Sequence, residues 1–293
     1  MSISVNWTNP YEDRRGQWYT GTLHTHTSPA SKCGKVALPR VLELYAQAGF
    51  DFLAVSDHMA FTPASHPEMV MIPAVEWNSA AGEHTGILSL NPAVLEHAIG
   101  ISEQEALLAW LADQDALVVL NHPNWQSTPH YRREQLAAKG PYDGIEIFNN
   151  VIERLDGYAI STDKWDYLLA GGKKVLGFAS DDSHLESDVG WGKVVVRSAS
   201  RGAAGLLDAI RRGNFYCSSG VTIGDIRREG SRVTIESPDA QEIHAIGQGG
   251  KLLERRFATD MAFEISEACG TYVRFALYGQ GSAMAWTQPF FLA

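Results

Sequence analysis

The sequence has few cysteines and no long apolar run. Its three cysteines, Cys33, Cys217 and Cys269, are too few and too far apart for a disulfide scaffold or a paired-cysteine zinc site. No stretch approaches the roughly 18 uninterrupted apolar residues that a membrane helix needs, and the first residues contain no apolar segment of secretory length. We therefore expect a cytoplasmic protein, in which histidines and carboxylates must hold any metal ion.

Basic residues are also scarce relative to acidic ones. The chain has 24 Lys and Arg against 34 Asp and Glu, so its formal net charge is -10. Because nucleic acids and anionic membranes are bound mainly through Lys and Arg, we expect neither a broad nucleic-acid surface nor a membrane partner. A small-molecule ligand fits this charge better, since metal ions can supply positive charge at a local site.

The 293 residues are 45% hydrophobic and 20% charged, which is typical of one large globular domain or of a large domain with a small companion. From about residue 19 to residue 212, short apolar runs alternate with segments of helical period. This alternation predicts an α/β domain, residues 1–213, with a mostly parallel sheet or barrel. The predicted strands are 19–23, 52–55, 70–75, 86–90, 117–120, 144–148, 175–179 and 194–196, and the predicted helices are 38–48, 102–113, 132–138, 162–170 and 203–212.

The last eighty residues have a different pattern. From residue 214 onward the helical period disappears, and short strand-like runs are separated by Gly, Asp and Ser. The clearest of these runs are 232–236, 242–246, 261–265 and 272–278. They predict a small antiparallel, β-sandwich-like domain over residues 214–293.

Five of the predicted strands end in histidines or acids. These strand ends carry His24 and His26, His58, Glu76, His122, and Asp182 with His184. The carboxyl ends of parallel strands meet on one face of a β/α barrel, where such folds place their active sites. Because side-chain direction repeats every two residues, an alternating His-x-His points both imidazoles to the same side. This spacing favours chelation of one ion by His24 and His26.

His84 precedes its predicted strand instead of following it. If the chain turns back after Glu76 through residues 78–82, His84 also lies on the same rim. A single motif of this kind is more often a turn or a helix cap. Six of the ten histidines follow the pattern, however, and the joint set predicts a functional site. We interpret the other four as surface or core residues: His66, His97, His130 and His244.

The ordered set of Leu-His-x-His, Ser-Asp-His, Glu, a downstream His, Asn-His-Pro and Ser-Asp-Asp-Ser-His resembles the PHP (polymerase and histidinol phosphatase) family. The match runs from about Gly21 to His184. The resemblance implies metal-dependent phosphoesterase activity on a distorted (β/α)7 barrel, followed here by the small antiparallel β domain. Segments 73–76, 82–90 and 142–149, and the ending from Ala285, are also similar to the branch that contains the carbaryl (carbamate) hydrolases.

The resemblance further implies two or three divalent metal ions, and Mn, Zn and Fe all suit such ligands. The implied sites are His24, His26, Glu76 and Asp182 for the first ion, Glu76, His84 and His122 for the second, and His58 and His184 for the third. One departure affects the third site. Family members of the trinuclear type carry an Asp or His shortly after the His-x-His, where this chain has Ser31 and Cys33. Cys33 is then either a soft ligand suited to zinc or an ordinary loop cysteine.

A cluster of divalent ions lowers the pKa of a bridging water from ~15.7 toward ~7, which supplies hydroxide at neutral pH. We therefore predict a hydrolase of small-molecule phosphate mono- or diesters, such as a nucleotide or a sugar phosphate, with Glu76, His84 and Asp182 as catalytic residues. Two alternatives stay open. The same centre could cleave a carbamate, amide or ester, or the chain could be a non-catalytic metal-binding module.

Candidate substrate contacts are Lys32, Lys35 and Arg154, which follow predicted strands on the rim. Each of these cations could equally lie on a solvated loop. A cationic rim would favour a phosphate substrate, whereas an apolar pocket would favour a carbamate. We also expect Asp57 and Asp181 to orient ligands from behind. Trp77 and Trp125 lie next to ligands and either stack on substrate or pack in the core.

Overall fold

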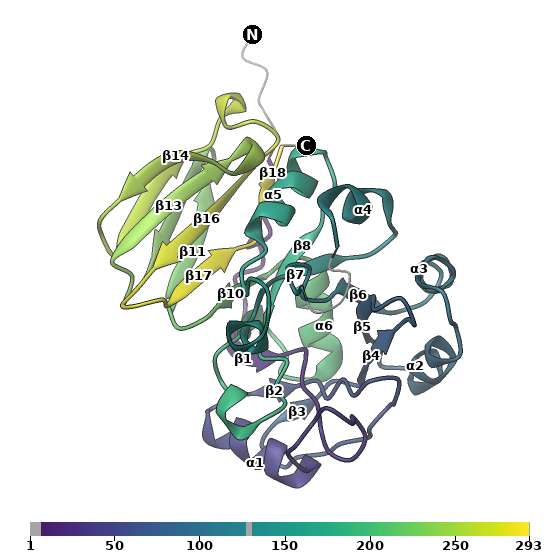
Figure 1. The fold of residues 1–293 in the computed structure, drawn as a ribbon. Coiled ribbons are helices and arrows are strands. Elements are labelled where there is room, and N and C mark those ends of the chain that lie inside the picture. The colour runs from purple at the N-terminus through teal and green to yellow at the C-terminus, as the bar shows by residue number, and fades with distance from the viewer. Residues whose placement is uncertain (1–6, 127–130, 293) are drawn as a thin grey trace.

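The computed structural model describes residues 7–126 and 131–292. Two sheets form its framework, and a third, smaller sheet packs against the C-terminal strands of the largest sheet (Figure 1). In spatial order the largest sheet contains β14 (Lys251–Arg256), β13 (Glu242–Gly247), β16 (Tyr272–Tyr278), β17 (Met284–Thr287), β10 (Phe215–Ser218), β9 (Lys193–Ser198), β1 (Gln17–Thr22), β2 (Phe52–Leu53) and β3 (Val70–Met71), with β18 (Phe290–Phe291) paired to β16. The second sheet contains β4 (Ala74–Asn78), β5 (His84–Leu88), β6 (Leu117–Leu120), β7 (Gly144–Asn149) and β8 (Leu176–Ser180), and the third contains β11 (Asp225–Glu229), β12 (Arg232–Glu236) and β15 (Asp260–Glu264).

Helices connect the strands of the first part of the chain, and several of them pack against these strands. They are α1 (Leu38–Gln47), α2 (Pro92–Ile99), α3 (Gln104–Leu111), α4 (Arg133–Ala138), α5 (Thr162–Ala170) and α6 (Ala203–Arg211), with short 3₁₀ turns η1 (Asn150–Arg154), η2 (Glu186–Asp188), η3 (Gln248–Gly250) and η4 (Glu267–Cys269). Helix α1 shows how the sequence pattern sets burial, because Val41, Leu42 and Tyr45 recur at helical spacing and all three are buried. In the described part of the chain, no helix combines the length and the apolar character needed to cross a membrane.

The fold is mixed α/β, as predicted, but its sheet is not mostly parallel. Strands β1, β2 and β3 are parallel, as are β6, β7 and β8. Strand β5 instead pairs antiparallel with both neighbours, and β9 pairs antiparallel with β1. Strands β4 and β5 are antiparallel because only residues 79–83 connect them, and two parallel neighbours would need a much longer crossover.

No closed barrel forms among the described residues, which corrects the prediction of a (β/α)7 barrel. Isolated parallel bridges join the two main sheets: Thr25 after β1 pairs with Ser183 after β8, and His58 after β2 pairs with Glu76. The chain therefore curves into an open framework whose two sheets approach each other at the strand ends. This is the rim where the sequence placed its candidate ligands. Contrary to the prediction, Glu76 lies inside β4 and not after the end of its strand, because β4 begins only at Ala74 and runs on to Asn78.

The C-terminal strands are antiparallel, as predicted, and they form a layer beside the first part of the chain (Figure 1). Apolar residues of the three-stranded sheet share one core with residues of β13 and β16: Ile226, Val233, Ile235, Met261, Ile243, Ala245 and Phe275. Strand β10 pairs with both β9 and β17, so hydrogen bonding is continuous across residue 214. The division into domains 1–213 and 214–293 stays a prediction.

Candidate metal centre

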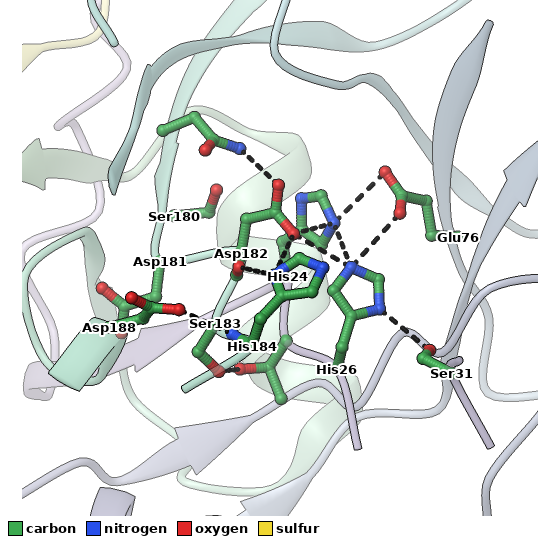
Figure 2. Close-up of polar contacts among 12 residues, drawn as sticks. His24, His26, Ser31, Glu76, Ser180, Asp181, Asp182, Ser183, His184 and Asp188 are labelled. Atoms are coloured by element: carbon green, nitrogen blue, oxygen red, sulfur yellow. Dashed lines mark hydrogen bonds and ion pairs between the residues drawn. The ribbon is translucent and has the colours of Figure 1, made fainter. Parts of the chain in front are cut away.

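His24 and His26 follow β1 and lie side by side, as the His-x-His spacing predicts. Their Nε2 atoms are 3.1 Å apart. The Nε2 atom of His26 lies 2.9 Å from Oδ1 of Asp182, and that of His24 lies 3.2 Å from Oε1 of Glu76. All four residues are buried, with at most 4% exposure. Figure 2 shows their polar atoms directed toward one another. Two imidazoles from one strand and two carboxylates from other strands therefore converge on one point.

Glu76 lies between this group and three further histidines. Its Oε1 atom is 3.1 Å from Nδ1 of His84 and 3.2 Å from Nε2 of His122, and its Oε2 atom is 3.0 Å from Nδ1 of His58. The β4–β5 hairpin pairs Asn78 with His84, so the chain reversal expected after Glu76 does bring His84 to the rim. The carboxylate of Glu76 thus faces two groups of imidazoles, which is the position that a bridging ligand requires.

The eight predicted ligands meet at one site, and three groups of them have ligand atoms close enough to hold a metal ion. These groups are His24, His26 and Asp182; His58, Glu76 and His84; and His26, His58 and His184. Cys33 lines the same cleft and belongs to none of these groups. Burial opposes ionisation of its thiol, but contact with His184 lowers the pKa of that thiol, so both interpretations of Cys33 stay open. The described clusters are thus sufficient for several divalent ions without Cys33.

Three buried atoms at the site, Nδ1 of His58, Oε2 of Glu76 and Oδ1 of Asp182, make no hydrogen bond of regular geometry. Each instead faces another candidate ligand atom at 2.9–3.3 Å. An unpaired buried polar atom costs roughly 1–3 kcal/mol, so such atoms are rare in native proteins. All three belong to predicted ligands, and imidazole nitrogen and carboxylate oxygen are the donors that Mn, Zn and Fe accept. The residues present therefore fit a metal centre.

The site also holds unusual backbone. His122 and Asp182 have φ angles of 30° and 50°, and among the described non-glycine residues only Met59 shares this left-handed region. Such a conformation costs of order 1–3 kcal/mol and persists only where the surroundings enforce it. At both positions the chain leaves a strand and turns sharply, which points the ligand side chain into the centre.

Charge within the cluster shifts its pKa values. Burial opposes ionisation of Glu76, but the nearby His24, His84 and His58 hold its pKa well below the usual range. Burial would lower the pKa of His26, yet hydrogen bonds to Asp182 and Glu76 raise it to about 10. Without metal, Glu76 is therefore ionised at neutral pH, and the raised pKa values of His24 and His26 favour protons on these two imidazoles that offset the carboxylate charge.

Glu146 of β7 holds the centre from behind, and the sequence analysis missed it. This buried carboxylate accepts from Nδ1 of His24 at 2.8 Å, from the backbone N–H of His122 at 2.7 Å and from Nδ2 of Asn149 at 2.9 Å. A carboxylate on Nδ1 fixes the tautomer that presents Nε2 as the ligand atom. The available signal was an acid inside the apolar run 144–148.

Ser31 supports His26 at the position where the resemblance leads one to expect a carboxylate. Nδ1 of His26 lies 3.1 Å from the hydroxyl of Ser31, which donates to Oδ1 of Asp57 at 2.7 Å. Asp57 therefore acts on a candidate ligand through Ser31. Asn121, which the sequence analysis did not single out, donates to Oε1 of Glu76 at 2.8 Å. A side chain at Gly86 would meet Asn121 at 3.0 Å, so the glycine leaves room for this contact.

Asp181 does not orient a ligand ring, contrary to expectation. It accepts from the hydroxyl of Tyr45 and from the backbone N–H groups of Gly190, Trp191 and Gly192. Burial raises its pKa to about 6, although these donors favour the charged form. Asp181 thus fixes the loop between β8 and β9 and has no direct contact with a candidate ligand ring among the described residues.

A cleft of about 400 Å³ opens above the candidate ligands. Lys35 and Arg154 line it, whereas Lys32 is exposed and is not part of its wall. Arg154 pairs with both oxygens of Asp188 at 2.8 and 3.0 Å, so a buried carboxylate already balances its charge. Apolar side chains line much of the rest of the cleft: Trp125, Val151, Ile152, Leu155 and Leu185. The cleft therefore combines a polar floor, one uncompensated cation and a hydrophobic side.

The two candidate tryptophans have different positions, one at the site and one in the core. Trp125 lies against His84 and His122, with ring centroids 5.6 and 5.1 Å apart. Trp77 is fully buried and donates to the carbonyl of Ile101, so it belongs to the core. The histidines expected to lie outside the site do so where the structure describes them, at His66, His97 and His244, and His130 lies outside the described residues.

No protein-family model matches this sequence, and no curated protein sequence matches it. Among solved structures, a two-domain protein from Bacteroides vulgatus that contains a predicted PHP-like metal-dependent phosphoesterase has a TM-score of 0.54 and 16% identity. The similarity covers 100% of this chain and 90% of that chain. The fold is PHP-like.

A second similar structure is the lesion-specific endonuclease PfuEndoQ from Pyrococcus furiosus, with a TM-score of 0.53 and 12% identity. Here the match covers 68% of this chain and 56% of that chain. At these identities the similarity concerns the fold, and the Bacteroides structure agrees with the PHP resemblance seen in the motifs. The chemistry of the site rests on its own residues.

Replacing Glu146 with Gln is expected to weaken metal binding about 10–100-fold, because loss of an outer carboxylate disturbs the tautomer and orientation of its ligand histidine. The measurement is titration of the chelated protein with Mn²⁺ or Zn²⁺. His97→Ala is the matched control, since His97 is exposed and stacks on Trp110. Equal affinities for the wild-type protein and the Glu146→Gln variant would show that this carboxylate has no role in positioning His24.

Proposed function

We propose that this chain is a metal-dependent hydrolase that cleaves phosphate mono- or diesters of a small molecule, such as a nucleotide or a sugar phosphate. One observation carries the proposal. Three buried ligand-type atoms that make no regular hydrogen bond and face other candidate ligand atoms at about 3 Å, on His58, Glu76 and Asp182, belong to residues that line an open cleft able to admit a small molecule. A purely structural metal site would be closed by its own ligands.

When bound, divalent ions would lower the pKa of a coordinated water and polarise a phosphoryl oxygen. The chain's own residues set the geometry. Glu76 holds the two groups of histidines at a fixed separation, and Asn149 donates to Oδ2 of Asp182 at 3.2 Å, which leaves Oδ1 directed at the histidines. His84 borders the cleft with its side chain 12% exposed, where it can reach a substrate as well as a metal ion.

Substrate binding follows from the walls of the cleft. Because Asp188 balances Arg154, Lys35 is the cation left to meet an anionic group, and the metal ions would carry most of the attraction for a phosphate. Val151, Ile152 and Leu155 would contact the organic part of the ester. We therefore propose a small phosphorylated partner whose ester group has an apolar face.

A second candidate is hydrolysis of a carbamate, amide or ester at the same centre. The observation that favours it is the apolar wall with Trp125 beside His84 and His122, which suits an aromatic leaving group. Two adjacent ions match the two free oxygens of a phosphate better than the single oxygen of a planar carbonyl. The phosphate ester stays the preferred substrate for this reason.

Side-by-side assays of the Mn-loaded enzyme on aryl phosphate mono- and diesters, nucleotides and aryl carbamates test the choice. We expect turnover of at least one phosphate ester, reduced to background in Asp182→Asn, which removes a ligand charge without changing side-chain size. Carbamate turnover that depends on Asp182, with no phosphate ester cleaved above the Asp182→Asn background, would replace the first function with the second.

A further inference from the structure

A second cleft, of about 640 Å³, lies on the other side of η1 from the metal centre. Its walls come from η1, from the loop between β8 and β9 and from the β16–β17 hairpin of the C-terminal sheet. Asn150 and Glu153 of η1 face this cleft, whereas Val151, Ile152 and Arg154 of the same turn line the metal-centre cleft. The two clefts therefore share one short segment but have different linings.

Aromatic side chains dominate the second cleft. Phe148 and Trp286 are buried in its floor with ring centroids 5.8 Å apart, and Tyr278 lies at its edge. Trp191 is 56% exposed, yet its position is fixed. Its indole donates to the carbonyl of Ser187 at 3.1 Å, and its backbone N–H donates to Asp181 at 2.9 Å. A rigid, exposed tryptophan at the mouth of a cleft is suited to stacking against a ligand.

The polar groups in this cleft are mostly uncharged. They include Asn150, Ser219 and Gln280, with Glu153 as an acid. No lysine, arginine or histidine is among the described residues that line it, so the cleft offers an anion no favourable charge, unlike the metal-centre cleft. Amide and hydroxyl groups hydrogen-bond to neutral hydroxyls, while the aromatic faces bury apolar C–H surface.

We propose that this second cleft binds the ring of an uncharged sugar. A sugar has an apolar C–H face for Trp191 and peripheral hydroxyls for Asn150, Gln280 and Glu153. The volume lies within the usual range of roughly 300–1,000 Å³ for small-molecule sites. The proposal does not depend on the hydrolase reaction, because no candidate metal ligand lines this cleft.

Calorimetric titration with glucose, N-acetylglucosamine, maltose and cellobiose tests the site. We expect saturable binding of at least one sugar with a dissociation constant in the millimolar range, unchanged when metal is removed by chelation. Trp191→Ala should weaken binding by about tenfold or more, equivalent to ~1.4 kcal/mol. Trp191→Phe, which keeps an aromatic face, should retain most of the affinity. The control is Tyr158→Ala, because Tyr158 is 69% exposed and is not part of the lining.

Three results would overturn the proposal. These are no saturable binding of any of the four sugars, equal binding by the wild-type protein and the Trp191→Ala variant, or binding of choline with none of the sugars. The last result would identify the cleft as an aromatic site for a cation beside Glu153. Loss of hydrolase activity with retained sugar binding would instead contradict only the proposed reaction, since binding is measured on the chelated protein.

Discussion

The substitution Glu76→Gln is expected to reduce activity more than any other single change, by about two to three orders of magnitude. Glu76 is fully buried and faces His84 and His122 through one oxygen and His58 through the other. Breaking a buried charge pair costs ~3–5 kcal/mol, and each ~1.4 kcal/mol is tenfold in rate. Loss of this carboxylate would also leave two neighbouring cations without their shared anion.

Glu83→Gln is the matched control for this experiment. Glu83 precedes β5 and lies at the end of the same β4–β5 hairpin, but it pairs with Lys139 at 2.6 Å and lines no part of the metal-centre cleft. Steady-state rates and elemental analysis of both variants give the comparison. If Glu76→Gln keeps both its metal content and a rate within about threefold of wild type, the bridging role of Glu76 is wrong.

Local sequence pattern was enough to predict many elements of the fold. Strands β6, β12 and β16 and helix α5 have the predicted bounds, because each is a continuous apolar or periodic segment with a clear end. The run 70–75 splits into β3 and β4 at Ile72–Pro73, since proline cannot donate a ladder hydrogen bond. Helix α2 was missed although its start carries a capping Asn91 followed by Pro92, and Val94, Leu95 and Ala98 are buried at helical spacing.

Local sequence pattern could not predict whether the sheet closes into a barrel, nor which residues hydrogen-bond to the candidate ligands. Whether β5 runs parallel or antiparallel depends on the turn at 79–83, and the strand pattern is the same for either direction. The ligand histidines were found because strand ends must converge, which is a rule of topology. Glu146 belongs to the interior of β7 and meets Asn149 of the same strand, but only the tertiary fold brings His24, which follows β1, to this carboxylate.

Loading the chelated protein with Mn²⁺ or Zn²⁺ is expected to give at least two ions per chain and a large gain in stability. The ligands of two sites are present without any contribution from Cys33. A ligand at 100 times its dissociation constant stabilises the native state by ~2.7 kcal/mol, so two ions supply about 5 kcal/mol. For a chain of this size that corresponds to a rise of roughly 10 °C in the unfolding temperature.

The gain in stability on metal binding should increase with pH, because the raised pKa values of His24 and His26 determine the direction of the pH dependence. In the metal-free protein the pKa of His26 is raised to about 10 and that of His24 is also raised, against an unfolded value of about 6.5. Their stabilising contribution is therefore complete below about pH 6.5 and is lost as the pH rises toward 10. Metal binding must displace these protons, so its affinity rises up to tenfold per proton for each pH unit in this range.

Thermal unfolding with and without chelator, at about pH 6 and about pH 9, measures both effects together. The difference in unfolding temperature between loaded and chelated protein should be larger at the higher pH, because the chelated form loses the charge pairs of His24 and His26 while the loaded form keeps its ligands. Glu83→Gln should behave as the wild-type protein does. Fewer than two bound ions would contradict the expected number of sites, and a difference that narrows as the pH rises would contradict the assignment of His24 and His26 as metal ligands.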